Sequence, residues 1–580
     1  MQLPPVWHQR LTSVMMVLLA SLIGLPAVVK ITDPGAFENE KHLPPTPAFD
    51  PLAYAASKSG QLSNPEATVP AQCYTKTQGI SNPCWTCHTD PQAPNEWVDW
   101  DLQESYDFSE FALTNRWTNL FKDRHAAMAR ISDEAVLAYI REDNYTPLMN
   151  ALSNRADYPG YKPDLDFRQG FDHTGFARDG SQWRAFRYKP FPGAFWPTNG
   201  HTDDVMLRLP KPFRTLNGIP NREIYKINLS LLEAAIASPP KAPNQPHGQY
   251  PTEPISETLA NFDIDGNGNI EGFARTIAEL PAHFAGDASA IPLETYVYPR
   301  GTEFLHSVRY IDPEKPGQTG TRMKELRYAR KAAFLDSWAM TKVYEKEYNE
   351  KEEGSLPSYA GSPFVGLRNS YGWQIQGFIE DAEGRLRLQS FEEHQFCMGC
   401  HGSLGITVDH SFSLPRKVPG AKGWGYQDFN GIQDVPQIGH KKGEIATYFE
   451  RVGGGDEFRT NREILDRFFQ DGRPLTSALK RAAPGGDQDL TYLIFPSHDR
   501  AMALNKAYMT IVAEQQFEKG RDIIIGPIDL VHRKIENGTT DLGRTKRVFR
   551  DGRIWLDWGV QPKPSSQAVG SDQEKRKKDG

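Results

Sequence analysis

The chain has 580 residues with a formal net charge of −7 at pH 7, and 38% of its residues are hydrophobic while 24% are charged. This composition is typical of a globular protein, and the length suggests three or four domains. So small a net charge gives no reason to expect nucleic acid as a partner.

The N-terminus is predicted to be an export element. Residues 11–29 are apolar and uncharged, with Arg10 before them and Lys30 after them. A stretch of this length can just span a bilayer, and Arg10 places the rest of the chain outside the cytoplasm. The nearest small-x-small cleavage site, Ala53-Tyr54-Ala55, lies too far downstream for a cleaved signal. We therefore expect a hydrophobic N-terminal helix that anchors the protein, in preference to a cleaved signal peptide.

Two cysteines followed by a histidine occur twice, as Cys84-Trp85-Thr86-Cys87-His88 and as Cys397-Met398-Gly399-Cys400-His401. C-x-x-C-H is the pattern of covalent c-type haem attachment. One turn of backbone lets both thiols reach the two vinyl groups of one haem, and the next residue then directs its imidazole at the iron. With 5 Cys and 15 His in 580 residues, random placement predicts roughly 0.001 occurrences of the pattern.

Two other interpretations of the cysteine pairs are weaker. Zinc ribbons place their pairs about 15–20 residues apart, far closer than Cys87 and Cys397, and zinc does not require a histidine after each pair. A thioredoxin-like redox pair would need a βαβ setting, which neither motif has. The fifth cysteine, Cys73, is expected to be a small buried hydrophobic residue.

On these motifs and the export element, the chain resembles the c-type cytochromes, specifically a large dihaem member. The resemblance implies two covalent haem c groups, with His88 and His401 as iron ligands. It also implies attachment outside the cytoplasm, in agreement with the N-terminal segment. We therefore expect a periplasmic or other extracytoplasmic protein.

After the first motif, residues 117–143 have the apolar spacing of two consecutive helices, with Ser132 as the cap of the second. His125 lies on this helical segment and is a candidate second ligand of the first haem, although a lone histidine is more often bonded to a neighbour. Residues 157–220 favour turns and short strands. Residues 223–238 indicate a helix and 239–254 a linker.

Residues 263–271 follow the start of an EF-hand calcium loop, which needs oxygen donors at positions 1, 3 and 5 and a glycine at position 6. Position 12 should be a glutamate but is Ala274, so the carboxylate must come from Glu271 or from elsewhere. The alternative is an Asn/Gly turn without an ion. The predicted calcium ligands are Asp263, Asp265, Asn267, Asn269 and Glu271.

Residues 291–311 favour two strands around Pro299-Arg300-Gly301. His306 lies among apolar residues of the second strand. A histidine there is usually a satisfied core residue, but in a chain that needs further iron ligands it is the first candidate for a distal ligand. Residues 323–353 are then predicted to form one long helix.

Residues 372–389 indicate a hairpin that leads directly into the second motif. His410 and His440 follow that motif, and either could reach the opposite face of its haem. Further on, residues 461–469 and 499–517 favour helices, while residues 521–531 favour a strand.

These elements predict an α+β fold, with helical segments around two haems and irregular β-rich material between them. The expected division is 1–30 signal or membrane anchor, 31–70 linker, 71–240 first haem-binding region, 241–380 middle region with the calcium-type loop, 381–560 second haem-binding region and 561–580 disordered tail.

The leading functional hypothesis is electron transfer with redox partner proteins, since spare histidines could make both irons six-coordinate. The rival is a dihaem enzyme of the peroxidase or oxygenase type, in which one haem stays open. The length of 580 residues favours the rival, because two carrier haems need far less protein.

Overall fold

The structure is a computed structural model that describes residues 49–559 except 96–99, 105–107, 194, 241–248, 455–457, 459–460, 537–541 and 546. The described residues from Asp50 onward form one compact unit. The expected anchor at 1–30, residues 31–48 of the expected linker and the tail at 561–580 lie outside the described residues. The six-part division of the chain stays a prediction.

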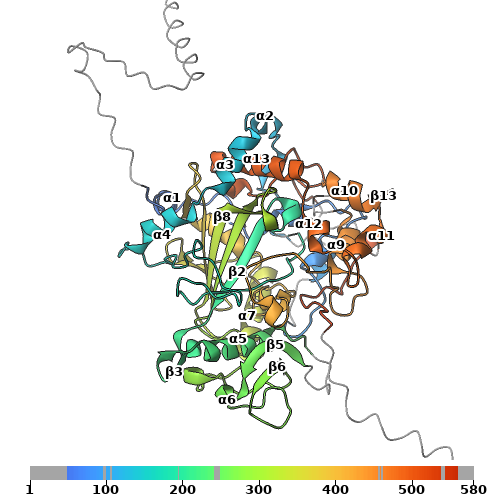
Figure 1. The fold of residues 1–580 in the computed structure, drawn as a ribbon. Helices are drawn as coiled ribbons and strands as arrows, with labels where there is room; N and C mark the ends of the chain where they lie inside the picture. The colour runs from blue at the N-terminus through green and yellow to red at the C-terminus, as the bar shows by residue number, and fades with distance from the viewer. Residues whose placement is uncertain are drawn as a thin grey trace, which may run out of the picture. The chain divides into compact units, whose positions relative to one another are not determined.

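An eight-stranded antiparallel sheet is the centre of the fold (Figure 1), and the α+β class is confirmed. All of its strands lie between the two cysteine motifs in sequence, so the expected β-rich material is one ordered sheet. The strand order is β1 (Arg184–Ala185), β2 (Thr202–Arg208), β7 (Glu303–Ile311), β8 (Thr319–Lys331), β11 (Trp373–Glu380), β10 (Gly366–Arg368) and β9 (Ala360–Ser362), with β12 (Leu386–Leu388) paired to β11.

The two faces of this sheet serve different purposes, because successive side chains of a strand point to opposite faces. Met206, Leu305, Leu326 and Phe378 face an apolar core that includes Leu148 of α4 (Tyr145–Ser153). The alternate residues face a cavity. Val205, His306 and Arg327 are paired in register across β2, β7 and β8, and all three line that cavity.

Helices pack around the sheet. The helices α3 (Asp133–Arg141) and α13 (His498–Glu514) contact each other and the central strands, and both lie at the top of Figure 1. The short helix α8 (Phe391–Met398) packs on β10 and β11. Helix α5 (Arg222–Ala237) is almost fully buried and contacts the ribbon formed by β5 (Tyr250–Ser256) and β6 (Phe273–Ile277).

The remaining described elements are short, apart from one helix of 16 residues, α7 (Ser337–Glu352). The helices are α1 (Ala53–Ser57), α2 (His125–Met128), α6 (Glu257–Ala260), α9 (Glu444–Val452), α10 (Arg462–Phe468), α11 (Thr476–Leu479), α12 (Leu490–Ile494) and α14 (Leu542–Thr545). The strands form two small ribbons, β3 (Thr215–Leu216) with β4 (Ile219–Pro220) and β13 (Phe469–Gln470) with β14 (Arg473–Pro474).

Several expected elements are confirmed. Two helices, α2 and α3, occupy the 117–143 segment, and the Ser132 hydroxyl caps α3 by accepting the amide of Ala135 at 3.2 Å. The helix at 223–238, the hairpin at 372–389 and the helices near 461–469 and 499–517 are also present.

The single long helix predicted at 323–353 is wrong, because its first part is the central strand β8 and only α7 is helical. Lysine, glutamate and arginine favour helix in isolation, but pairing on both sides overrides that preference. The buried lysines of β8 have partners. Lys324 donates to the Gly200 carbonyl at 2.6 Å, and Lys331 forms an ion pair with Asp409 at 2.5 Å.

Two strand predictions are also wrong. Residues 291–298 form no strand beside β7, since Pro292 and Pro299 interrupt the pairing. Residues 521–531 form no strand: they make single hydrogen bonds to the 120–124 segment, and only their end pairs with residues 75–76, through one isolated bridge from Val531 to Thr75. That stretch lines the cavity instead, through Ile523, Ile524, Ile525 and Ile528.

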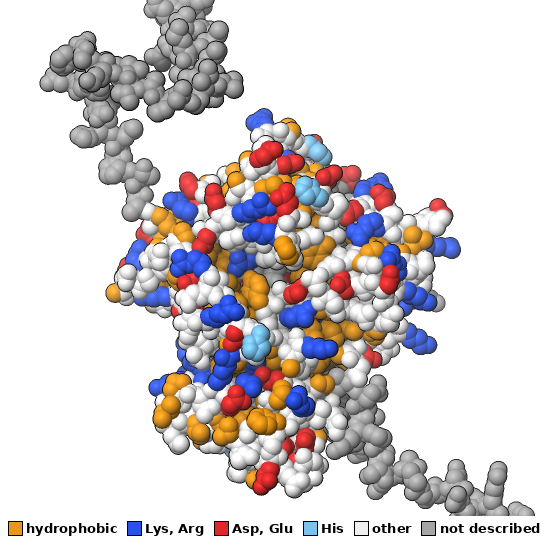
Figure 2. Space-filling view, viewed as in Figure 1, with side chains coloured by type: hydrophobic (Ala, Val, Ile, Leu, Met, Phe, Trp, Pro, Cys, Tyr) orange, Lys and Arg blue, Asp and Glu red, His pale blue; other side chains and the backbone are white. Residues whose placement is uncertain are grey.

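No helix within the described part of the chain combines the length and apolarity needed to cross a membrane. The surface seen in Figure 2 carries cationic and anionic side chains interspersed with small hydrophobic patches. A mixed surface of this kind is typical of a folded globular domain.

Candidate cofactor site

One cavity of about 610 Å³ receives residues from both cysteine motifs. Cys87 comes from the first motif, while Cys397, Cys400 and His401 come from the second. The walls are largely aromatic and aliphatic, and include Phe191, Phe195, Phe304, Phe396, Phe412, Trp373 and four isoleucines of the 523–528 segment. A pocket of this size with apolar walls and a few convergent polar groups is suited to a large flat organic cofactor.

Helix α8 positions the second motif. Ser390 and Glu393 form a capping box at its start, and Glu393 makes an ion pair with Arg387 at 2.9 Å. His394 is a purely structural residue, since Nε2 accepts the Gly377 amide at 2.9 Å and Nδ1 contacts the Ser390 carbonyl at 2.7 Å. The helix is thereby held on β11, and it ends at the motif.

The backbone forms the same hydrogen-bonded turn in both motifs. The His401 amide donates to the Cys397 carbonyl at 3.1 Å, and the His88 amide donates to the Cys84 carbonyl at 2.8 Å. One helical turn therefore brings the two cysteines and the histidine of each motif to neighbouring positions. In the first motif, the buried Trp85 fixes the turn, and its amide donates to the Asn82 side chain at 3.0 Å.

The imidazole of His401 is oriented by the backbone. Its Nδ1 contacts the His410 carbonyl at 2.8 Å, and the residue lines the cavity. Burial, together with the charges of Arg327 and His306, lowers the pKa of His401 to about 4. A neutral imidazole held through Nδ1 by a carbonyl presents Nε2 as a metal ligand.

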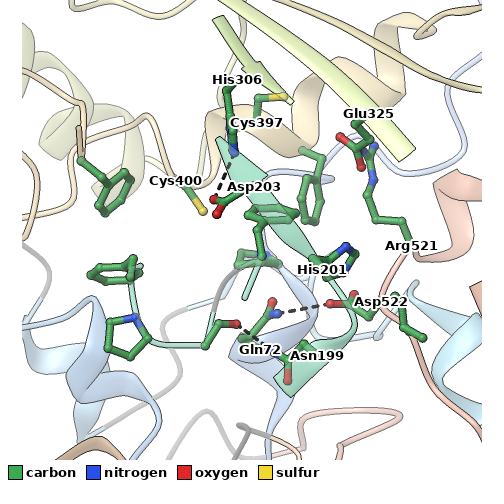
Figure 3. A pocket seen from close by; sticks show the side chains of 18 of the residues that line it. Gln72, Asn199, His201, Asp203, His306, Glu325, Cys397, Cys400, Arg521 and Asp522 are labelled. Atoms are coloured by element: carbon green, nitrogen blue, oxygen red, sulfur yellow. Dashed lines mark hydrogen bonds and ion pairs between the residues drawn. The ribbon is translucent and has the colours of Figure 1, made fainter. Parts of the chain in front are cut away.

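His306 lies on the cavity face of β7, as Figure 3 shows. Its Nε2 contacts Asp203 Oδ2 at 3.2 Å, and the dashed line in Figure 3 marks this contact. Arg327 is its register partner on β8 and forms an ion pair with Glu325 at 2.7 Å. The predicted distal ligand therefore belongs to a polar row on an otherwise apolar wall.

The other predicted distal ligands have different positions. His125 reaches the rim of the cavity, but its side chain is 66% exposed and contacts Asp123 at 2.7 Å. His410 lines the cavity and stacks on Tyr371 with the ring centroids 3.4 Å apart. Because its Nδ1 contacts the Gly402 carbonyl at 2.5 Å, His410 supports the loop that carries His401.

His88 and His440 do not belong to the cavity lining, and neither does Cys84. His440 stacks on Trp85 at 6.3 Å between ring centroids. Its Nε2 contacts the Asp551 backbone carbonyl at 2.8 Å and the Asp551 carboxylate at 3.2 Å. His440 is thus a neighbour of the first motif that is already bonded elsewhere.

One cavity residue, His201, is not among the ligands predicted from the sequence. It immediately precedes β2 and lines the cavity (Figure 3), and only 9% of the residue is exposed. Burial, followed by the charges of Lys324 and Arg327, holds the pKa of His201 well below its ordinary value. The alternation His201, Asp203, Val205 toward one face of β2 was the signal that could have identified it.

The two motifs lie close to each other through the segment before Cys73. A Cβ on Gly399 would overlap the Thr68 carbonyl oxygen, and Asn95 Nδ2 donates to the Thr407 carbonyl at 2.5 Å. Burial raises the pKa of the Cys73 thiol, and Cys84 and Cys400 raise it further. Cys73 therefore has one cysteine of each motif as a neighbour.

The calcium-type loop lies between β5 and β6, and its oxygen donors converge. One ligand oxygen each from Glu257, Asp263 and Asp265 lies within 4.8 Å of the others. Asp263 accepts the amides of Gly266 at 2.9 Å and Gly268 at 2.8 Å. Glu271 is exposed and outside this group, whereas the buried Glu257 of α6 is the further carboxylate that converges with the loop.

The residues of the second motif fit a covalently bound haem, since Cys397, Cys400 and His401 all line the cavity. All five cysteines are free thiols, so both pairs are available for thioether bonds. His401 has the orientation of an axial ligand. The lining also carries Arg327, Arg416, Arg462, Arg500 and Arg521, cations of the type that pair with carboxylates such as haem propionates.

Comparisons with known proteins identify a lipoprotein relationship. A family model described as "-like lipoprotein" matches residues 57–480. The chain is 34% identical over 531 residues to an uncharacterized lipoprotein of Aquifex aeolicus (strain VF5), a match that covers 81% of this chain and 88% of that protein. It is also 27% identical over 157 residues to an isoleucine–tRNA ligase of Chlamydia caviae, covering 26% of this chain and 15% of that enzyme. No solved structure matches.

The resemblance to the dihaem c-type cytochromes is therefore wrong as a family assignment. The matching family model covers both motifs and describes lipoproteins, and so does the relative that covers most of the chain. The physical reason is that each five-residue motif reflects only the local geometry needed to attach one group. Unrelated folds can meet the same requirement, so the motifs do not identify a family.

Proposed function

Starting from a chain that belongs to this lipoprotein family, we propose that the protein binds two haems covalently through its C-x-x-C-H motifs and transfers electrons outside the cytoplasm. Haem supplies reversible one-electron chemistry when bound. The chain's own cysteines would attach the group, its histidines would bind the iron and the apolar walls of the cavity would exclude water. Redox proteins are the expected partners.

The observation that carries the proposal is the geometry around His401. Cys397, Cys400 and His401 line one cavity with Cys87 of the other motif, and the His410 carbonyl holds the His401 ring through Nδ1 at 2.8 Å. A zinc site would need four ligands converging on one point. The apolar walls of a cavity of about 610 Å³ favour a large organic group instead.

Removing the cysteines tests the proposal. The protein would be expressed with export in a host that attaches haem covalently, and bound haem would be counted by the pyridine haemochrome assay after denaturation. The wild type should retain two haems per chain, and each double variant, Cys84→Ala/Cys87→Ala or Cys397→Ala/Cys400→Ala, should retain one.

Cys73→Ala is the matched control for these variants, because it removes a neighbouring cysteine that belongs to no motif. It should keep both haems. A purified wild-type protein that contains zinc and no haem would contradict the proposal.

A second candidate function is catalysis at one open haem, as in a dihaem peroxidase or oxygenase. The row Asp203, His306 and Arg327 on the cavity face favours it. His306 bonded to a carboxylate can accept a proton from a bound small molecule, and Arg327 can stabilise negative charge that develops there. The two functions differ in the role of His306: in the electron carrier it would coordinate an iron, and in the enzyme it would act as the base.

Membership of a lipoprotein family indicates an extracytoplasmic protein that is held at a membrane. The sequence has no cysteine before Cys73, so none stands directly behind the apolar segment 11–29 to carry a lipid. We propose that this segment itself is the anchor. Release of the exported protein from membranes by alkaline carbonate would contradict that proposal.

Calcium is proposed as a structural ion in the loop before β6. The support is the convergence of Glu257, Asp263 and Asp265, combined with the spacing of donors and glycine in residues 263–268. A site of this type outside the cytoplasm works at about 10⁻⁴–10⁻³ M calcium.

A further inference from the structure

We propose that the buried ion pair between Lys331 and Asp409 positions the axial imidazole of His401, by fixing the turn whose backbone carbonyl accepts the His401 Nδ1 proton. The proposal rests on the proposed haem at the second motif and extends it to two residues outside that motif. Neither residue is part of the cavity lining, so both are positioning residues that act through His401.

Residues 408–411 form a tight turn. Val408 and Ser411 exchange two backbone hydrogen bonds, at 3.0 and 3.1 Å, as an isolated antiparallel bridge. The two residues between them have positive φ, 47° for Asp409 and 57° for His410. A two-residue turn with φ > 0 at both central positions is of type I′, in which Asn-Gly is strongly preferred. Because neither residue here is glycine, contacts with the rest of the fold must hold this backbone.

Asp409 supplies contacts of this kind. Its Oδ1 lies 2.5 Å from Lys331 Nζ, and both side chains are 0% exposed. Its Oδ2 accepts the Tyr298 amide at 2.9 Å, and its backbone carbonyl accepts Trp373 Nε1 at 2.8 Å. Each oxygen of Asp409 is therefore bonded to a different part of the core.

Lys331 connects both central residues of the turn to the end of strand β8. Besides Asp409, its Nζ binds the Tyr371 carbonyl at 3.0 Å, and the Tyr371 ring stacks on His410 with the centroids 3.4 Å apart. The His410 carbonyl in turn contacts His401 Nδ1 at 2.8 Å. Since a carbonyl can only accept, Nδ1 carries the proton, and Nε2 keeps its lone pair for a metal.

The expected consequence is a change in reduction potential. A hydrogen bond from Nδ1 to a carbonyl makes an axial imidazole a more basic ligand, and such hydrogen bonds are among the features by which a protein sets a haem potential. Loosening the turn weakens this bond. The ferric form then loses stabilisation, and the potential rises. An ion pair that only stabilised the fold would leave the potential unchanged.

The experiment measures the midpoint potential by spectroelectrochemistry in the Cys84→Ala/Cys87→Ala background, where only the second haem remains. Haem content and the unfolding midpoint are recorded for each variant. Asp409→Asn keeps the side-chain size and tolerates positive φ, but it sets an amide donor against either Lys331 or the Tyr298 amide. It should raise the potential. Lys331→Gln, the milder variant, keeps a donor toward Asp409 and should raise the potential less.

Glu233→Gln in the same background is the matched control. It breaks a similarly buried ion pair, Glu233 with Lys417 at 2.8 Å, neither of whose residues is part of the cavity lining. It should lower the unfolding midpoint and leave the potential unchanged. A full haem content with unchanged potential in both Asp409→Asn and Lys331→Gln would overturn the inference. A background protein without haem would instead contradict the proposed function.

Discussion

At the scale of single residues, the backbone carbonyls that orient the imidazoles control what the cavity can do. His410 supplies its carbonyl to His401 at 2.8 Å while its own ring bonds to Gly402. His410 has a positive φ of 57°, a conformation that few residues other than glycine adopt. This local strain is maintained by the stack of its ring on Tyr371.

The residue that decides between carrier and enzyme is His306. If its imidazole coordinates an iron, His306→Ala should turn one haem high-spin and let it bind CO, while the wild type binds little. Ferric absorption spectra and CO titration of the ferrous protein measure this change. The matched control is His125→Ala, since its side chain is 66% exposed and should leave both spectra unchanged.

The opposite outcome for His306 is equally informative. Suppose that the wild type already contains a CO-reactive haem and that His306→Ala alters neither spectrum. His306 is then held by Asp203 alone, the open iron is native, and the enzyme becomes the better proposal.

At the scale of elements, the strands carry polar groups of the cavity, and helix α8 carries Cys397, one of the cysteines proposed to attach haem. The sheet presents His306, Arg327 and Asp203 on one face because alternate residues of paired strands share a face. Helix α8 presents Cys397 at its last turn, fixed by the capping box at its start. A rigid sheet opposite a capped helix holds a site more precisely than loops can.

The β5–β6 element provides a prediction about calcium. Asp263→Ala and Glu257→Gln should lower the unfolding temperature in millimolar calcium more than in chelator, because an ion that binds only the native state stabilises it. At ten times its dissociation constant the ion contributes about 1.4 kcal/mol. A smaller loss in chelator is expected for Asp263→Ala, since Asp263 also accepts loop amides.

Glu271→Gln serves as the control for the calcium loop, because Glu271 is exposed and outside the converging group. It should behave like the wild type in both buffers. Equal losses for Asp263→Ala with and without calcium would mean that the loop is only a turn.

At the scale of the whole molecule, Cys87 of the first motif and the second motif line one cavity, although the entire sheet separates the motifs in sequence. The turn of the second motif packs on residues 68–70, which lead to Cys73 and then to the first motif. The two motif regions therefore form an interface with each other.

Gly399→Ala tests this interface. A Cβ there would overlap the Thr68 carbonyl oxygen, so one of the two backbone segments must move. We expect a loss of about 1–3 kcal/mol in the free energy of unfolding, which is typical of overpacking. Denaturant unfolding measures it. Gly425→Ala is the control, since its Cβ would meet nothing closer than Arg187 Cδ at 3.9 Å, and an equal loss in both variants would refute the interpretation.

The sequence by itself determined the local chemistry of this protein. The spacing of Cys397, Cys400 and His401 predicted one helical turn, and the spacing from Asp263 to Gly268 predicted a tight loop of oxygen donors, because both depend only on neighbouring residues. Ser132 as a helix cap could be predicted for the same reason. The family could not be predicted from motifs this short.

Only the tertiary structure decided which distant residues share the site. Residues 319–331 became a central strand because two neighbouring strands pair with them, which their helix-favouring composition does not reveal. His201 lies in the cavity because it directly precedes β2, whose cavity face it continues. Glu257 lies beside the calcium-type loop because the preceding helix α6 places it there. Contacts between residues hundreds of positions apart depend on packing of the whole chain, and no local pattern encodes them.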